Sequence, residues 1–473
     1  MKVTDKETKY SQLQTNIEDS LQEDSAEHES NAGVYASLKI TENNITNGFV
    51  VKDRLLEKIM EKENVRVALK RVISNKGSHG VDGMKVDELR AYLNNNWTTL
   101  KQSVMDGSFR PNPARRVEIL KEDGIKKRKL GIPTTVDRVI QQAIGQILSP
   151  MYEGQFSDNS YGFRPKRSAH QAIRKCQQYI QEGYIYAVDM DLEKYFDTIN
   201  HSKLIETLSR TIKDGRVISL IHKYLRAGVV IGYSYEETIE GVMQGGPLSP
   251  LLGNVMLNEL DKVLEQRGHR FARYADDLMI YCKSKRSALR ILDNTVSFVE
   301  KKLFLKVNRD KTKVDLAWKL KFLGFSFYKS KGEVRVRIHP KSIAKMKAKV
   351  KLLTGRSFGI SNEERPIKLR RYIMGWINYF KIADIKTMLK RVDEWMRRRI
   401  RMIYWKQWKK VRTKLSQLIA LGIEKSKAWE FANTRKGYWR ISNSPIMSRS
   451  LTNDVLKKRN YIFFSDYYSH VNA

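Results

Sequence analysis

Two adjacent acids, Asp276 and Asp277, follow Tyr274 and Ala275 in a short segment that has apolar residues on either side. Adjacent carboxylates inside a strand-turn-strand cost free energy unless a cation meets them. Nucleotidyl transfer commonly uses two Mg²⁺ ions about 3.5–4 Å apart, one activating the attacking 3′-hydroxyl and one steadying the leaving pyrophosphate. An isolated acidic pair is more often a solvated hairpin turn, so metal chemistry here requires a third carboxylate.

A candidate for the third carboxylate lies in residues 188–197, where acids follow an apolar, β-type run. Asp191 ends this run and precedes Asp276 by 85 positions. Asp189 is the rival candidate, because side chains two positions apart in a strand lie on the same face. Asp197 is expected to cap a helix or to form a salt bridge.

A segment containing glycine and proline, residues 244–250, lies between the two acidic motifs and leads into an apolar helix. Its glycines, Gly245 and Gly246, allow close approach of a ligand or another backbone. A nucleotide and its template base could lie against this loop, which begins at Gln244. The alternative is an ordinary helix start, where Gly and Pro are common.

Basic residues outnumber acidic ones: 88 Lys and Arg against 52 Asp and Glu give a formal net charge of +36. Such a protein usually has a polyanionic partner, most commonly nucleic acid. The alternative is a basic protein of the ribosomal type, or one that binds polyanions without specificity. The two cysteines, Cys176 and Cys282, lie far apart, which argues against disulfide or zinc frameworks and indicates a reducing, cytoplasmic setting. No apolar run reaches the ~18 residues that span a bilayer, so no membrane partner is expected.

The composition changes along the chain. Residues 1–50 contain nine acids against four lysines and are predicted to be a disordered extension. Helical and β-type runs alternate over residues 51–335, which predicts an α+β fold, with Asn64 a candidate helix cap near its start. Strand signals stop after about residue 335, and residues 336–420 are predicted to be helical, with a strongly basic helix over about 384–408.

In this order, the acidic motifs and the glycine-containing loop resemble the palm of a reverse transcriptase. The similarity to group II intron reverse transcriptases extends from about residue 53 to residue 473. It implies a right-hand polymerase with fingers, a palm made of an antiparallel sheet and helices, and an α-helical thumb. The stretches that carry the resemblance are residues 115–119, 130–134, 161–165, 244–250, 305–308, 322–327, 375–380 and 432–440.

The resemblance implies that Asp191 and Asp276 are the principal Mg²⁺ ligands at the catalytic site, with Asp277 beside them. In this family an aromatic residue follows the metal-binding aspartate by five positions, and Phe196 stands five after Asp191. This spacing favours Asp191 over Asp189. The Phe196 ring would exclude a 2′-hydroxyl and favour dNTPs, and a packing role in the core is the alternative.

Four residues match the nucleotide-binding positions of the family. Lys121 and Arg128 match fingers residues that hold the incoming triphosphate, a task that suits cations, although the turn between them is one residue longer than usual. Gln244 matches a residue packed on the incoming nucleotide, and Lys311 is expected near its phosphates. The sequence departs from the family at residues 242–243, where Val-Met replaces the usual Thr-Pro.

Residues 336–420 resemble the thumb, also called the maturase or X domain, and residues 421–473 resemble a short DNA-binding tail. Arg397 and Arg401 share one face of the basic helix at spacing i, i+4, and with Lys406 they are the predicted nucleic-acid-binding residues. Pairing with local acids or simple solvation is the alternative. No endonuclease motif is recognised in the sequence. In this respect the chain resembles the proteins of class C introns, which lack an endonuclease domain.

The family resemblance implies an RNA-directed DNA polymerase, a nucleotidyltransferase that uses an RNA template, a DNA primer or target, and dNTPs. It also implies binding of the parent intron RNA, assistance of its splicing, and support of retrohoming. Two alternatives stay open. One is an RNA-binding splicing cofactor without polymerase activity, against which the intact acidic triad argues. The other is a domesticated or defence-associated reverse transcriptase of the same lineage.

Overall fold

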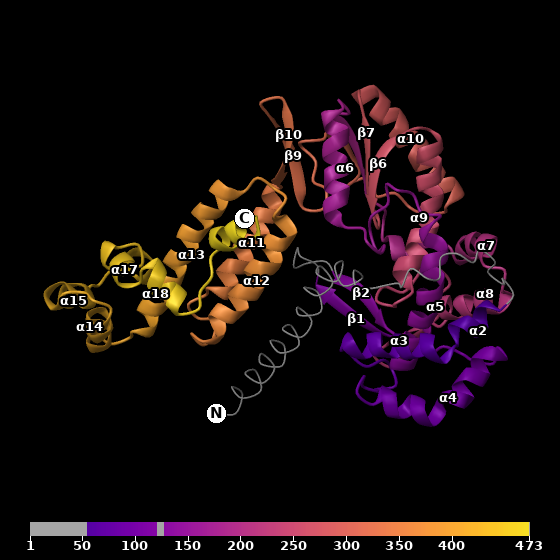
Figure 1. The fold of residues 1–473 in the computed structure, drawn as a ribbon, viewed down its shortest axis with the longest axis horizontal. Coiled ribbons are helices and arrows are strands. Elements are labelled where there is room, and N and C mark those ends of the chain that lie inside the picture. The colour runs from indigo at the N-terminus through magenta and orange to yellow at the C-terminus, as the bar shows by residue number, and fades with distance from the viewer. Residues whose placement is uncertain (1–53, 121–126, 473) are drawn as a thin grey trace. The chain divides into compact units, whose positions relative to one another are not determined.

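The computed structural model describes residues 54–120 and 127–472. The predicted extension at residues 1–50 and the predicted phosphate-binding Lys121 lie outside the described residues. The chain divides into two compact units, the first ending at Ala317 and the second beginning at Trp318 (Figure 1). Within the described part of the chain, no helix is both long enough and apolar enough to cross a membrane.

The first unit opens with helices that bury one apolar face each. The prediction of Asn64 as a helix cap is wrong, because the helix begins at Lys62 and Asn64 lies within it. The Asn64 side-chain amide instead donates hydrogen bonds to the carbonyls of Ile59 (2.8 Å) and Ala143 (3.1 Å), which ties this helix to a later one. The four helices are α2 (Leu55–Ile59), α3 (Lys62–Ser74), α4 (Leu89–Met105) and α5 (Thr135–Glu153).

A four-stranded sheet in the order β2-β1-β4-β5 belongs to the first unit. Strands β1 (Ala114–Leu120) and β2 (Lys127–Ile132) form an antiparallel pair in which Ile119 lies opposite Arg128. Strand β4 (Val229–Ile231) runs parallel to β1, and β5 (Ser234–Glu236) pairs antiparallel with β4. The pairing of β1 with β2 therefore holds Arg128 on a regular ladder.

The second sheet of this unit carries both acidic motifs. Its order is β6-β7-β3-β8, and every pairing in it is antiparallel. The register places Met190 opposite Leu278, so that the residue after β3 reaches the turn between β6 and β7. The strands are β3 (Tyr186–Met190), β6 (Arg270–Tyr274), β7 (Asp277–Cys282) and β8 (Lys313–Leu316).

Helices cover the second sheet and complete a common core. Helix α6 packs against β6, and α10 packs against β3 and β7 (Figure 1). Helix α9 follows the glycine-containing loop and is buried over most of its length. The elements are α6 (Ala169–Gln181), the 3₁₀ helix η3 (Tyr195–Thr198), α7 (His201–Thr211), α8 (Gly215–Leu225), α9 (Ser249–Gln266) and α10 (Lys285–Lys302).

The second unit begins with an antiparallel pair, β9 (Phe325–Ser330) and β10 (Glu333–Ile338), and is helical beyond it in the residues described. The basic segment predicted as a helix forms α13, which packs against α11, α16 and α19. The α+β fold class is confirmed. The helices are α11 (Pro340–Leu353), α12 (Glu364–Phe380), α13 (Lys386–Gln407), α14 (Val411–Ala420), α15 (Lys425–Ala432), α16 (Tyr438–Ile441), α17 (Pro445–Ser450), α18 (Asn453–Lys458) and α19 (Phe464–Val471).

Candidate active site

The adjacent acids lie at a tight turn between β6 and β7. Tyr274 pairs with Asp277, and Ala275 and Asp276 form the turn between them. Ala275 has a φ of 55°, in the left-handed region that residues with a side chain seldom adopt. This conformation leaves Asp277 exposed at the start of β7 and Asp276 half-buried.

The Asp276 carboxyl lies in an environment that disfavours its charge. Burial raises its pKa, and the negative charge of Asp191 raises it further, whereas Arg128 and Arg273 act in the opposite direction. A carboxylate pair raises pKa in this way only when the two groups are close. The strand register places Asp191, directly after β3, beside the β6–β7 turn that contains Asp276, and the positive charge of Arg128 acts on the Asp276 carboxyl.

Asp191 is held at the end of β3 by the segment that precedes β8. Its N–H donates to the Thr312 hydroxyl (3.2 Å) and its carbonyl accepts from the Asn308 N–H (2.8 Å). The Lys311 ammonium donates to Asp191 Oδ2 at 3.1 Å. Lys311 therefore lies at the Asp191 carboxylate.

The rival candidate Asp189 lies beside other residues, and its charge affects Tyr281. It lies inside β3, opposite Met279 and Lys313. Its negative charge contributes to the raised pKa of the buried Tyr281, for which burial is the main cause. Asp191 follows the last residue of β3, Met190, which lies opposite Leu278, so the register favours Asp191 over Asp189 as the neighbour of the turn that contains Asp276.

Phe196 lies in η3, where its ring rests against the backbone of α9. A Cβ on Gly253 would be 3.1 Å from Phe196 Cε1, so the glycine makes room for the ring. The neighbouring Tyr195 is fixed by its hydroxyl, which donates to the Gly253 carbonyl at 2.6 Å. The Phe196 ring is only half-buried, so part of it can contact a ligand.

The glycine-containing loop is tied on both sides despite lacking the usual Thr-Pro. The Val242 N–H donates to the Phe196 carbonyl (2.6 Å), and the Gly131 N–H at the end of β2 donates to the Gln244 carbonyl (2.8 Å). The Gln244 side chain donates to Asp197 Oδ1 at 3.4 Å. These bonds connect strand β2 to residues 196–197, which follow β3 and Asp191.

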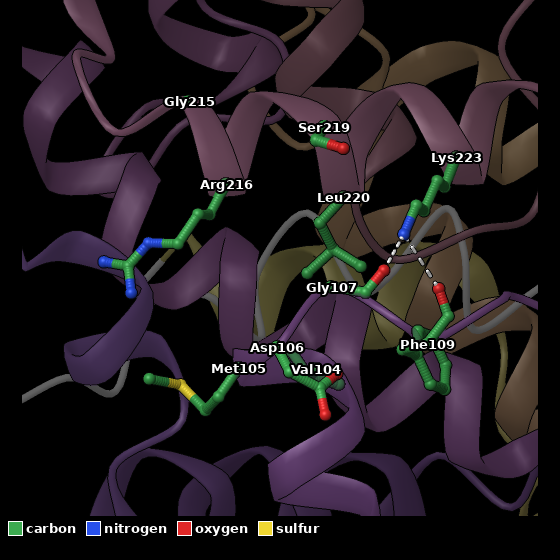
Figure 2. A pocket seen from close by; sticks show the side chains of 10 residues that line it. All are labelled: Val104, Met105, Asp106, Gly107, Phe109, Gly215, Arg216, Ser219, Leu220 and Lys223. Atoms are coloured by element: carbon green, nitrogen blue, oxygen red, sulfur yellow. Dashed lines mark hydrogen bonds between the residues drawn. The ribbon is translucent and has the colours of Figure 1, made fainter.

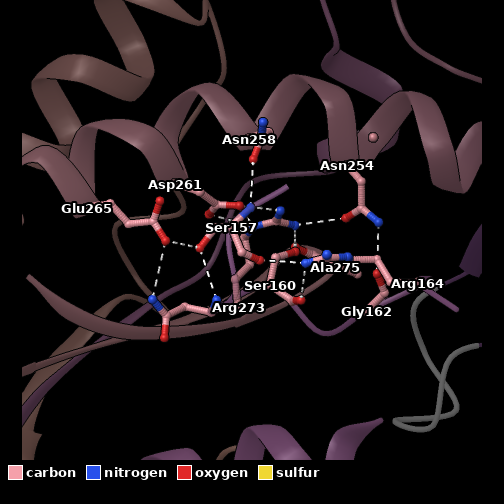
Figure 3. A network of polar contacts seen from close by, with 12 residues as sticks. Ser157, Ser160, Gly162, Arg164, Asn254, Asn258, Asp261, Glu265, Arg273 and Ala275 are labelled. Atoms are coloured by element: carbon pink, nitrogen blue, oxygen red, sulfur yellow. Dashed lines mark hydrogen bonds and ion pairs between the residues drawn. The ribbon is translucent and has the colours of Figure 1, made fainter. Parts of the chain in front are cut away.

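Sequence reasoning missed a polar network behind the turn between β6 and β7. Arg273 and Asp261 form an ion pair whose side chains are 1% and 0% exposed, and Asn254 bonds to the same guanidinium (Figure 3). A signal was present: polar residues occur at positions 254, 258, 261 and 265 of helix α9, and the first three of them are buried. That spacing places them on one helical face.

The predicted nucleic-acid-binding residues on α13 make contacts within the second unit. Arg401 donates to the Leu451 carbonyl (3.1 Å) and the Ser448 hydroxyl (3.2 Å), and burial lowers the pKa of its guanidinium. The Arg397 guanidinium lies 5.1 Å from the centroid of the Phe463 ring. Lys406 donates to Arg356 and Ser357.

Aromatic side chains that were not among the predicted nucleic-acid-binding residues are exposed in the same unit. Trp429 is 58% exposed, Tyr438 40% and Trp439 39%. The Arg398 guanidinium lies 3.8 Å from the centroid of the Trp439 ring, and Arg356 lies 5.1 Å from that of Tyr438. Exposed rings beside cations are typical of surfaces that stack nucleic-acid bases.

A pocket of about 250 Å³ in the first unit contains none of the predicted site residues. It lies between the end of α4 and the start of α8, and its cations are already engaged (Figure 2). Lys223 donates to the carbonyls of Gly107 and Phe109, and Arg216 pairs with Glu57 and Asp214. The pocket therefore offers no free cation from these two residues to a ligand.

The carboxylates suit a divalent metal ion. Hard cations prefer carboxylate oxygens, and Mg²⁺ is commonly held by one or two carboxylates together with substrate phosphates. Asp191 and Asp276 provide such a pair. Among the described residues, no group of three or more His, Cys, Asp or Glu side chains is arranged to hold a metal ion unaided.

Comparison with known proteins identifies two domains. Residues 119–327 match the family "Reverse transcriptase (RNA-dependent DNA polymerase)", and residues 343–418 match "Group II intron, maturase-specific domain". The chain is 35% identical to protein YkfC of Escherichia coli (strain K12) over 301 residues, which cover 55% of this chain and 79% of YkfC.

Further similarities cover smaller parts of the proteins matched. The group II intron-encoded protein LtrA of Lactococcus lactis subsp. cremoris is 37% identical over 235 residues, which cover 50% of this chain and 39% of LtrA. Among solved structures, a chain of a partial Cas6-RT-Cas1–Cas2 complex matches with a TM-score of 0.34 and 21% identity, over 52% of this chain and 42% of that one.

The reverse transcriptase domain defines the class of the protein, that of RNA-directed DNA polymerases, which generally depend on divalent metal ions. The chain belongs to the group II intron reverse transcriptase/maturase family. The predicted right-hand polymerase fold is confirmed by this membership. Its two domains support RNA-directed DNA synthesis together with assistance of splicing, and they imply RNA as a partner.

Proposed function

We propose that this chain extends a DNA primer with dNTPs on an RNA template, using Mg²⁺ at Asp191, Asp276 and Asp277. The observation that carries the proposal is the register of the β6-β7-β3-β8 sheet, which places Asp191 at the end of β3 beside the β6–β7 turn that contains Asp276. Bound there, Mg²⁺ would activate the primer 3′-hydroxyl and steady the leaving pyrophosphate. The negative charge of Asp191 raises the pKa of Asp276, and a divalent cation bound there would relieve this repulsion.

The residues around the carboxylates have distinct tasks in this proposal. Arg128 and Lys311, with Lys121, hold the triphosphate, since cations stabilise its negative charge. Gln244 packs on the incoming nucleotide from the loop that is bonded to β2. The exposed part of the Phe196 ring meets the position of a 2′-hydroxyl and excludes ribonucleotides by steric clash.

The second unit is proposed to bind nucleic acid through residues 336–420, as the thumb and maturase domain, and through the tail at 421–473. The proposed phosphate contacts are Arg397, Arg401 and Lys406. Each would contact phosphate through the N–H donors that it does not use in intramolecular hydrogen bonds. Exposed rings of the tail, Trp429 and Trp439 among them, add stacking surfaces. The partners are intron RNA, whose splicing the protein assists, and the DNA target of retrohoming.

The setting proposed for this activity is the cytoplasm. Both cysteines are buried and free, which suits a reducing environment.

Primer extension on an RNA template with purified variants tests the catalytic proposal. Asp276→Asn and Asp191→Asn should each abolish extension, whereas the matched control Asp189→Asn should retain substantial activity. RNA affinity should stay close to wild type in all three, because basic residues provide most of it. An inactive Asp189→Asn protein beside an active Asp191→Asn protein would overturn the assignment, and a wild-type protein inactive with every divalent metal would overturn the proposed activity.

A further inference from the structure

The β6–β7 turn holds a conformation that its own sequence does not favour. Ala275 occupies the left-handed region at φ 55°, where a Cβ crowds the backbone and where glycine is the usual residue. Such a conformation persists only where the surroundings impose it. The next residue is Asp276, so whatever imposes the turn also directs the proposed metal-binding carboxylate.

One side of the turn is bonded to the Arg273 guanidinium. Arg273 Nη1 donates to the Ala275 carbonyl at 2.9 Å and to Asn254 Oδ1 at 3.0 Å (Figure 3). Arginine can make both bonds at once because its donors are fixed in one plane. The bond to Ala275 therefore depends on where the guanidinium is held.

Asp261 fixes that guanidinium from within α9. Arg273 Nε lies 2.8 Å from Asp261 Oδ1, and Nη2 lies 2.5 Å from Oδ2, a two-pronged pairing with both side chains buried. The main chain of Arg273 is held as well, because its N–H donates to the Asn159 carbonyl and its carbonyl accepts from the Tyr161 N–H. Side chain and backbone are thus fixed independently.

The opposite side of the turn meets Gly162. A Cβ on Gly162 would lie 2.3 Å from the Ala275 nitrogen, so the two backbones are in direct contact. Asn254 Nδ2 donates to the Gly162 carbonyl at 2.8 Å. Asn254 thereby connects both sides of the turn, accepting from Arg273 on one side and donating to Gly162 on the other.

Helix α9 presents these groups along a single face. Asn254 and Asp261 contact the turn through Arg273, whereas Asn258 and Glu265 bond to Ser157, away from the turn (Figure 3). Asn258 Nδ2 also donates to the Gln155 carbonyl at 3.0 Å. The face therefore contains two buried asparagines one helical turn apart, of which only one reaches the catalytic turn.

We propose that Arg273 is a positioning residue for nucleotidyl transfer. Clamped by Asp261 and Asn254, it imposes the left-handed turn at Ala275 and so directs the Asp276 carboxylate toward Asp191. This inference rests on the proposed function of those carboxylates. It assigns a role in catalysis to a group that touches neither substrate nor metal.

The two asparagines provide a matched test. Asn254→Ala and Asn258→Ala each remove a buried amide from the same face of the same helix, so both should lower the melting temperature. We expect Asn254→Ala to reduce kcat between about 10-fold and 100-fold, with the KM for dNTP little changed, because small misplacements of a reacting group carry losses of this size. Asn258→Ala should keep kcat close to wild type at a temperature where both proteins are folded.

A rescue experiment isolates the conformation of the turn. Glycine adopts positive φ without strain, so Ala275→Gly in the Asn254→Ala background should recover part of the lost kcat. A merely structural role for Asn254 predicts no such recovery. Arg273→Lys, which keeps the charge and loses the planar fork, should show the same loss of kcat as Asn254→Ala.

The kcat values of these variants decide the inference. Equal kcat values for Asn254→Ala and Asn258→Ala would overturn it, as would a loss of kcat that Ala275→Gly fails to recover. Should Asn254→Ala not fold, Arg273→Lys tests the role by itself, and a kcat close to wild type in that variant would overturn the inference. An inactive wild-type protein would contradict the proposed function itself, whereas an active wild type with unaffected variants contradicts the positioning role alone.

Discussion

Replacing Asp261 with Asn should lower the free energy of unfolding by about 3–5 kcal/mol, because it leaves the Arg273 guanidinium buried without a counter-charge. The magnitude follows from the burial of the pair, whose side chains are 1% and 0% exposed. Asparagine has almost the shape of aspartate and keeps one oxygen acceptor. The loss is therefore one of charge and not of packing volume.

A double variant separates the stability of this pair from its effect on the turn. Replacing a buried ion pair with apolar groups of similar volume is often neutral or stabilising, so Asp261→Leu/Arg273→Met should recover most of the stability lost in Asp261→Asn. Its kcat should stay low, because methionine cannot donate a hydrogen bond to the Ala275 carbonyl. The double variant would then recover the free energy of unfolding without recovering kcat.

Urea unfolding followed by circular dichroism measures the free energies, and the Glu63–Arg66 pair supplies a control. Those side chains are 63% and 68% exposed, so Glu63→Gln should leave the free energy of unfolding unchanged within error. An Asp261→Asn protein within about 1 kcal/mol of wild type would refute the reasoning, because that is the contribution of an exposed pair. A double variant as unstable as the single one would refute it too.

Three further predictions concern the site and the second unit. Phe196→Ala should incorporate rNTPs much more readily, since a steric clash disappears with the ring; an unchanged rNTP/dNTP ratio in an active variant would assign Phe196 to packing. Because burial and Asp191 raise the pKa of Asp276, its ionisation destabilises the metal-free fold above the unfolded pKa. Asp276→Asn should therefore raise the melting temperature at pH 7 while abolishing activity, and the gain should shrink as pH falls toward the unfolded pKa. Arg397→Ala/Arg401→Ala should flatten the log–log salt dependence of RNA binding by roughly two units, and parallel lines would restrict both arginines to their intramolecular contacts.

The sequence predicted those parts of the fold and of the candidate site that depend on residues close together in the chain. Asp276 and Asp277 lie in the predicted strand-turn-strand, and the spacing from Asp191 to Phe196 selected the aspartate whose charge the structure brings to Asp276. Periodicity also placed the basic helix α13 correctly. The hairpin and the helix each have their signal within a few residues, where backbone geometry decides which side chains share a face, whereas the choice of Asp191 came from the family resemblance.

Partners distant in sequence could not be predicted in the same way. Asparagine is a residue type that often caps helices, yet the Asn64 side-chain amide donates a hydrogen bond to a carbonyl 79 positions away on α5. Arg401 shares a face with Arg397 as predicted, but its donors meet Ser448 and Leu451, which only the folding of the tail brings near. The polar face of α9 is visible in the sequence, whereas its bond to the catalytic turn depends on tertiary structure.

Gly162 sets a limit on protein engineering of this enzyme. Replacing glycine with alanine outside the left-handed region ordinarily stabilises a protein by restricting the unfolded chain, and Gly162 is not among the glycines with positive φ. A design procedure that looks for stabilising Gly→Ala replacements would therefore select position 162. The added methyl group would meet the Ala275 nitrogen at 2.3 Å and push directly on the backbone that carries Asp276. Libraries that seek heat resistance in this polymerase should leave position 162 unvaried, because a methyl group there would displace the catalytic turn.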